Sequence, residues 1–97
     1  MADLDELIQR VLSYYPQVDT AVLRQAYDFA LRAHGEQRRV SGEPYIIHPL
    51  ETALIVAGLN LDLAALTAAL LHDVLEDTTV GLDELSRVFG AEVAKLV

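Results

Sequence analysis

The residues best suited to chemistry gather in one short stretch, where His72 and Asp73 are followed by Glu76 and Asp77. On a helix, His72 and Glu76 would share one face, and Asp73 and Asp77 would form a second such pair beside it. Burying these polar groups without partners is costly, and a divalent cation would remove that cost. The alternative is a solvated acidic helix end, although acids at a helix C-terminus oppose the helix dipole.

The chain has no cysteine, so a metal site in it would use nitrogen and oxygen ligands rather than thiolates. Two further histidines could take part. His34 closes an apolar helical pattern, where a histidine bonded to the last carbonyls is a simpler interpretation than a ligand. His48 stands between the apolar run Tyr45-Ile46-Ile47 and Pro49. Spacing alone leaves open whether His48 is a satisfied core histidine or a ligand.

A basic pair, Arg38 and Arg39, precedes Ser41 and Gly42 in a polar stretch at residues 35–43. Such a stretch predicts a loop longer than the usual helix connection, and loops of this kind are often functional. The arginines could be solvated, or they could stack on a base and pair with phosphate. A net charge of -8 argues against general nucleic-acid binding, so an anionic ligand would need this local basic patch.

Composition and periodicity favour an all-α fold. Hydrophobic residues make up 53% of the 97 residues, and only 3 prolines and 5 glycines interrupt them. The apolar spacing predicts helices from residue 4 to before Pro16, from a cap at Asp19 or Thr20 to residue 34, and from 49 to about 57. Further helices are predicted from a cap at Asp62 over residues 63 to about 75, over 82–89 and from 91 onward. The helix from residue 63 is apolar nearly all round, which predicts burial on most sides.

The N-terminus is acidic and lacks the basic and apolar regions of a signal peptide. The longest apolar stretch, residues 61–71, contains Asp62 and is too short to span a bilayer. We therefore expect a soluble, cytoplasmic protein that does not interact with membranes.

Three strings carry a resemblance to a known family: RAHG at residues 32–35, SGEPYIIHP at 41–49 and ALLHDVLEDT at 69–78. Together they resemble the hydrolase domain of the RelA/SpoT family, which makes and degrades the alarmone (p)ppGpp in the stringent response. The resemblance runs through essentially the whole chain. It implies an all-α, HD-domain-like bundle of about five to six helices. Residues 1–97 would be the N-terminal part of that domain, incomplete at the C-terminus, without the synthetase and regulatory domains.

The resemblance also implies roles for individual residues. His48, His72 and Asp73 would bind one divalent ion, usually Mn²⁺ in this family. Glu76 and Asp77 would position or activate the attacking water, and which of them takes the proton stays open. A hard cation with such ligands can polarise a phosphate oxygen and lower the pKa of a bound water.

Arg39 and Ser41 would lie against the guanine of the nucleotide. The family's reaction removes the 3′-pyrophosphate from (p)ppGpp, leaving GDP or GTP, and full-length members often carry the label GTP pyrophosphokinase. Val40 stands where the family often has a basic residue, which weakens the expected electrostatic hold on the nucleotide.

The family normally supplies one more aspartate ligand from a helix beyond residue 97. Three protein ligands imply weaker metal binding and little or no hydrolysis by this chain alone. The alternative is a non-catalytic helical interaction or regulatory domain that retains the motif. In either case, apolar faces on the helix from residue 63 and on the last segment lead us to expect a homodimer or a swapped helix.

Overall fold

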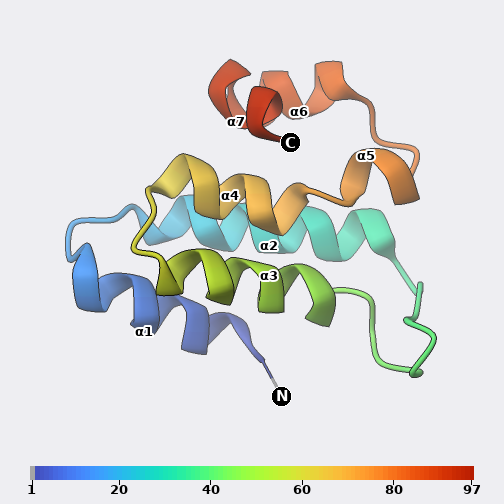
Figure 1. Cartoon of the computed structure of the whole chain (residues 1–97). Helices are drawn as coiled ribbons and strands as arrows, with labels where there is room; N and C mark the ends of the chain where they lie inside the picture. The colour runs from blue at the N-terminus through green and yellow to red at the C-terminus, as the bar shows by residue number, and fades with distance from the viewer. Residues whose placement is uncertain (1) are drawn as a thin grey trace.

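The computed structural model describes residues 2–97, which form an all-α bundle (Figure 1). The all-α prediction is confirmed: the described residues contain no strand, and seven helices follow one another along the chain. These helices are α1 (Leu4–Tyr14), α2 (Thr20–His34), α3 (Ile47–Gly58), α4 (Leu63–Leu71), α5 (Val74–Asp77), α6 (Leu82–Phe89) and α7 (Ala91–Leu96).

Aspartates cap the N-termini of three of these helices. The carboxylates of Asp3, Asp19 and Asp62 each accept a hydrogen bond from a backbone N–H two or three residues ahead, at 2.8, 3.1 and 3.0 Å respectively. Each bond satisfies one of the amide groups that a helix start leaves unpaired. The predicted cap at Asp62 is confirmed, and Asp19 rather than Thr20 caps α2.

Helix α4 forms the centre of the core, packed against α2, α3 and α7 (Figure 1). Leu66, Leu70 and Leu71 are completely buried, so the predicted burial of this helix on most sides is confirmed. Burying one leucine side chain contributes about 1.5–3 kcal/mol. The core therefore fixes α4 firmly, and with it the residues that follow its last turn.

The predicted extent of this helix, to about residue 75, is wrong. Helix α4 ends at Leu71, and α5 restarts at Val74 after a corner made by His72 and Asp73. The imidazole Nδ1 of His72 lies 2.6 Å from the carbonyl oxygen of Ala69, the group that would otherwise accept from the Asp73 amide. The side chain thus competes with the backbone for that carbonyl, and the regular helix stops.

Helix α3 begins two residues earlier than the predicted start at Pro49. The amides of Ile47 and His48 bond to the carbonyls of Pro44 and Tyr45, at 3.2 and 3.0 Å, so tight turns lead directly into the helix. Pro49 still lies in the first turn, where its missing N–H costs nothing. His48 consequently projects from the first turn of α3 rather than from the segment before it.

The predicted loop at residues 35–43 is confirmed and is folded as a tight hairpin. An isolated bridge pairs Arg38 with Pro44, and the amide of Arg39 bonds to the carbonyl of Glu43 at 2.9 Å. Gly42 closes the turn with a φ of 92°, a conformation that other residues rarely adopt. The hairpin holds the basic residues at the end of the bundle where α2 stops and α3 starts (Figure 1).

Within residues 2–97, no helix combines the length and apolar character needed to cross a membrane. Several large apolar side chains nevertheless lie on the surface. Ile55, Leu59 and Leu96 are 70%, 67% and 56% exposed. Nothing in the structure tests the expected dimer, which stays a prediction.

Candidate metal centre

The first turn of α3 and the corner between α4 and α5 bring His48, His72 and Asp73 together, and we call these three residues the His-His-Asp cluster. One ligand atom from each lies within 4.8 Å of the others. The Nε2 atoms of His48 and His72 lie 3.1 and 3.2 Å from the Asp73 Oδ2. The two imidazole rings stand 5.2 Å apart, nearly edge to face. The structure therefore places all three predicted ligands at one point.

The side chains of this cluster are neither fully buried, like those of the core, nor fully exposed. The side chains of His48 and His72 are 37% and 33% exposed, and that of Asp73 is 16% exposed. His48 is thus not a fully buried core histidine, the interpretation that its apolar neighbours left open. The cluster is held by the fold and still open to a small ion.

The tautomer of His72 makes the cluster a better fit to a cation than to a hydrogen-bonded triad. A carbonyl oxygen only accepts hydrogen bonds, so the Nδ1 of His72 must carry the proton in its contact with Ala69. In the neutral ring, Nε2 then presents a lone pair to the carboxylate of Asp73. Two acceptors face each other, and a cation between them or a second proton on the ring resolves the conflict. Metal-binding histidines commonly fix their tautomer through such an outer bond.

The distances also suit a divalent ion. Two ligand atoms held about 2.1 Å from a metal at a right angle are roughly 3.0 Å apart. The contacts from Asp73 to the two histidines are close to that separation. Imidazole with carboxylate accommodates several divalent metals, so the geometry supports a metal site without fixing which metal occupies it.

Tyr45 completes the surroundings of the cluster, and sequence reasoning did not single it out. Its hydroxyl contacts Oδ2 of Asp73 at 3.0 Å and Oδ2 of Asp77 at 2.7 Å. The bond to Asp77, followed by burial and then the bond to Asp73, raises the pKa of Tyr45 well above its ordinary value. The available sequence signal was its position three residues before His48 in the SGEPYIIHP string.

The two predicted water-activating acids differ in their connections. Asp77 is tied to the cluster through Tyr45, so the predicted pairing of Asp73 with Asp77 is present by way of that hydroxyl. Glu76 is exposed, and no hydrogen bond or ion pair links it to His72 within residues 2–97. The corner at His72 and Asp73 interrupts the continuous helix that was assumed for His72 and Glu76.

The fold and this cluster agree with the sequence comparison, in which residues 26–97 match the HD domain family. The chain belongs to the HD domain family. The resemblance to RelA/SpoT proteins is confirmed as well. The chain is 49% identical over 92 residues to the GTP pyrophosphokinase rsh of Brucella ovis, covering 95% of this chain and 12% of that protein.

Two other relatives carry names that specify the nucleotide. The guanosine-3′,5′-bis(diphosphate) 3′-pyrophosphohydrolase of Aquifex aeolicus is 51% identical over 94 residues, 97% of this chain and 13% of that protein. The bifunctional (p)ppGpp synthase/hydrolase SpoT of Escherichia coli is 47% identical over 93 residues, 96% of this chain and 13% of that protein. This HD domain thus spans about an eighth of the length of the curated relatives it matches.

The predicted nucleotide contacts of this HD domain lie in the hairpin. Arg39 pairs with Glu51 of α3 at 3.0 Å, one turn beyond His48, and Ser41 donates to Glu43 at 3.0 Å. Neither bonds to the cluster within the described residues, although the pair with Glu51 keeps Arg39 at the same end of α3. Sequence reasoning missed Glu51, whose three-residue spacing from His48 was the only available hint.

His34 ends α2, as predicted, but its expected bond to the last carbonyls of the helix is wrong. The ring is 3% exposed, and its Nδ1 lies 3.3 Å from the side-chain oxygen of Gln37. Its Nε2 is buried without a hydrogen-bond partner among the described residues. The imidazole stacks on Tyr45 with centroids 4.5 Å apart and does not belong to the ligand set.

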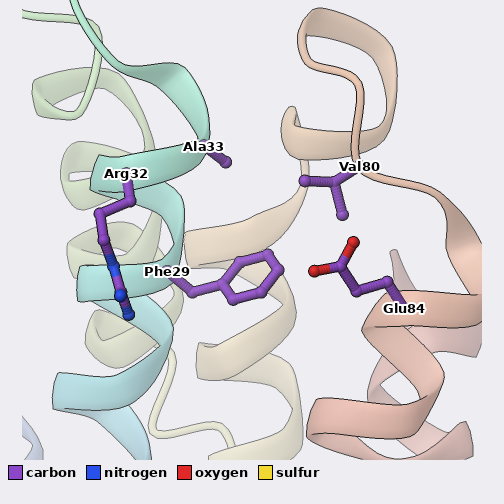
Figure 2. Close-up of a pocket in the computed structure, with 5 residues that line it drawn as sticks. All are labelled: Phe29, Arg32, Ala33, Val80 and Glu84. Carbon is purple, nitrogen blue, oxygen red and sulfur yellow. The ribbon is translucent and has the colours of Figure 1, made fainter.

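Two hollows on the surface differ in their relation to the cluster. One of about 310 Å³ lies between α2 and the start of α6, where Phe29, Val80 and Glu84 point toward one another (Figure 2). Its lining includes no residue of the His-His-Asp cluster. Another, of about 360 Å³, reaches His72 and is otherwise mostly apolar, lined from α3, α4 and Leu96. Of these two hollows, the second is therefore the one that adjoins the His-His-Asp cluster.

Proposed function

We propose that this HD domain is the N-terminal part of a (p)ppGpp 3′-pyrophosphohydrolase domain whose centre is one Mn²⁺ held by His48, His72 and Asp73. The observation that carries the proposal is the convergence of these three side chains at the corner after α4. The names of two relatives, which specify (p)ppGpp hydrolysis, support the choice of substrate. A longer parent protein acting in alarmone metabolism, with a cytoplasmic location, belongs to the same proposal.

When bound, the divalent ion would polarise a phosphate oxygen and increase the acidity of a nearby water. The chain's own part is to hold that water and accept its proton. We assign the proton to the carboxylate of Asp77, because the structure ties this group to the cluster through Tyr45. Glu76, exposed on the same turn, would position the water. The phosphorus would gain the water oxygen as its bond to the ribose 3′ oxygen breaks. Pyrophosphate would leave, and the 3′ oxygen would take up a proton to become a free hydroxyl.

Recognition of the guanine is assigned to Arg39 and Ser41. The guanidinium plane of Arg39 is suited to stacking on a base, and its pair with Glu51 already fixes the direction of the side chain. Ser41 can exchange its bond to Glu43 for one to the nucleotide. Because the rest of the chain is strongly acidic, these few groups carry the affinity for an anionic ligand.

A thermal melt with and without Mn²⁺, on the native chain and on His72→Ala, tests the metal part. Binding to the folded state alone stabilises it by about 2.7 kcal/mol at a hundredfold excess over Kd. We expect a rise in Tm for the native chain and none for the variant. If Mn²⁺ leaves both melting curves unchanged, the proposed metal centre does not form in this chain.

The substrate part is tested by adding ppGpp, GTP or ATP to the Mn²⁺-loaded chain and following both Tm and pyrophosphate release. We expect the largest shift in Tm with ppGpp and little turnover, because the His-His-Asp cluster supplies three ligands to the ion. Equal shifts with ATP and ppGpp would contradict the assignment to an alarmone.

A second candidate is a non-catalytic interaction or regulatory domain that associates with itself. The exposed apolar side chains of Ile55 and Leu59 on and just after α3 favour it. It predicts a dimer in light scattering together with no response to Mn²⁺. A monomer at high protein concentration would remove the support for this candidate.

A further inference from the structure

The hydroxyl of Tyr45 joins two carboxylates to which the proposed function gives different tasks. It lies 3.0 Å from Oδ2 of Asp73, a proposed metal ligand, and 2.7 Å from Oδ2 of Asp77, the proposed base. The same Asp73 oxygen faces both His48 and His72. One hydroxyl therefore sets the direction of a ligand atom and its distance from the base.

Two residues support this arrangement: His34, at the end of α2, and Gln37, three residues beyond it. The buried ring of His34 stacks on the ring of Tyr45 at 4.5 Å with a tilt of 31°. The amide of Gln37 donates to the backbone oxygen of Asp77 at 2.7 Å, while its own oxygen lies 3.3 Å from Nδ1 of His34. Asp77 is thus held through its side chain by Tyr45 and through its backbone by Gln37.

Stability alone does not explain a histidine at position 34. Its Nε2 is buried without a partner in the described part of the chain, which lowers the stability of the fold. A phenylalanine would fill a similar volume and stack on Tyr45 without that cost. What the histidine adds is the contact of Nδ1 with Gln37, and through Gln37 a connection to Asp77.

We propose that Tyr45 is a positioning residue of the metal centre, and that His34 and Gln37 hold Tyr45 and Asp77 in place. The proposal deepens the proposed function and rests on it. Tyr45 directs the Asp73 carboxylate toward the two histidines and keeps the carboxylate of Asp77 beside it. Outer partners of this kind raise metal affinity by orienting the ligands in advance.

The main test compares Tyr45→Phe with Tyr14→Phe, each of which removes one hydroxyl. The Tyr14 hydroxyl donates to the carbonyl of Leu61 at 2.9 Å, so the control also loses one hydrogen bond. Isothermal titration with Mn²⁺ should give a Kd roughly 10–100-fold weaker for Tyr45→Phe. Tyr14→Phe should lower Tm and leave Kd unchanged. Equal Mn²⁺ affinity in the native chain and Tyr45→Phe overturns the proposal, whatever happens to Tm.

A measurement on the metal-free chain separates this proposal from the proposed function. Carboxyl carbon NMR signals of Asp73 and Asp77 should both move in Tyr45→Phe and stay in place in Tyr14→Phe. If neither moves, Tyr45 does not orient these groups and the proposal fails. If both move while the native chain binds no Mn²⁺, the metal centre is refuted and the positioning contact stands.

The role of His34 is tested with His34→Phe, which keeps an aromatic ring against Tyr45 and removes the unpaired nitrogen. We expect an unchanged or higher Tm together with weaker Mn²⁺ binding, a combination that a purely structural residue would not produce. Weaker binding with a folded circular dichroism spectrum supports the proposal. An unchanged Kd removes His34 from it, even if Tm rises.

Discussion

The corner after α4 and the hairpin before α3 both carry predicted functional residues. The two regions differ in how deeply these residues are buried and in how many side chains contact them. At the corner, the side chain of Asp73 is 16% exposed and contacts His48, His72 and Tyr45. In the hairpin, Arg39 and Ser41 each contact one acid, and the intervening Val40 is fully exposed. The first region is organised by the core, the second by its own backbone turns.

The difference indicates a division of tasks. Residues that hold a metal need fixed directions, and the buried leucines of α4 supply a rigid base for them. Residues that meet a nucleotide can accept looser placement, because binding itself can order an exposed loop. We therefore expect changes in the core to affect metal binding and changes in the hairpin to affect nucleotide binding alone.

The largest expected effect follows the loss of the shared carboxylate in Asp73→Ala. The variant removes the only carboxylate of the ligand set, so its cost should exceed the roughly 10–100-fold that losing an outer partner causes. Mn²⁺ titration should show no measurable binding. Asp83→Ala, which removes an exposed acid on α6, is the matched control for net charge. Binding retained in Asp73→Ala would refute the assigned ligand set.

A core change should disturb the corner from a distance. Leu66→Ala removes a completely buried side chain from α4 and should lower the free energy of unfolding by about 2–5 kcal/mol. Urea unfolding measures that loss, and Mn²⁺ titration below the transition should show weaker binding. Val40→Ala at the hairpin tip should change stability by less than about 0.5 kcal/mol. Similar losses of unfolding free energy in Leu66→Ala and Val40→Ala would contradict the proposed difference between the corner and the hairpin.

Removing the cap of α4 tests whether its far end matters to the metal centre. Asp62→Ala loses the bond to the Ala65 amide and should cost about 1 kcal/mol of stability. Because the cap lies at the opposite end of α4 from His72, Mn²⁺ affinity should not change. Asp62→Asn, which keeps an accepting oxygen, should restore most of the lost stability in thermal melts. A fall in Mn²⁺ affinity would show that the whole helix responds as a unit.

A small change in stability is expected from releasing the hairpin arginine. The pair of Arg39 with Glu51 is partly exposed, so Glu51→Gln should cost no more than about 0.2–1 kcal/mol. Nucleotide binding, followed by the ppGpp-dependent shift in Tm, should change while the Kd for Mn²⁺ stays the same. If Mn²⁺ affinity changes instead, the hairpin and the corner are coupled and the division of tasks is wrong.

Local rules predicted much of the fold. Asp62 was identified as a cap, and Asp19 as one of two candidates with Thr20, because a cap depends on neighbours in sequence. The nearly continuous apolar character of α4 predicted its burial on most sides. The end of α4 was missed because it depends on the rotamer of one side chain, His72, which takes a carbonyl from the backbone. No local pattern encodes that choice.

The candidate site was likewise predicted only in part. The motif strings identified His48, His72 and Asp73, and the structure brings them together. Tyr45 was missed because its importance depends on contacts with residues about thirty positions away, at Asp73 and Asp77. Gln37 was missed for the same reason, since its partner on α5 lies 40 residues further along the chain.

The corner between α4 and α5 also has a consequence for the chain's topology. Because His72 and Asp73 are adjacent, they form one anchoring point, and His48 on α3 forms the other. An occupied centre would then close the segment from residue 48 to residue 72 into a single loop. Closing a loop lowers the conformational entropy of the unfolded chain, provided that the closure persists there. A metal at this corner would in that respect act as a reversible cross-link. It would connect α3 to the corner when the ion binds and free α3 when the ion dissociates.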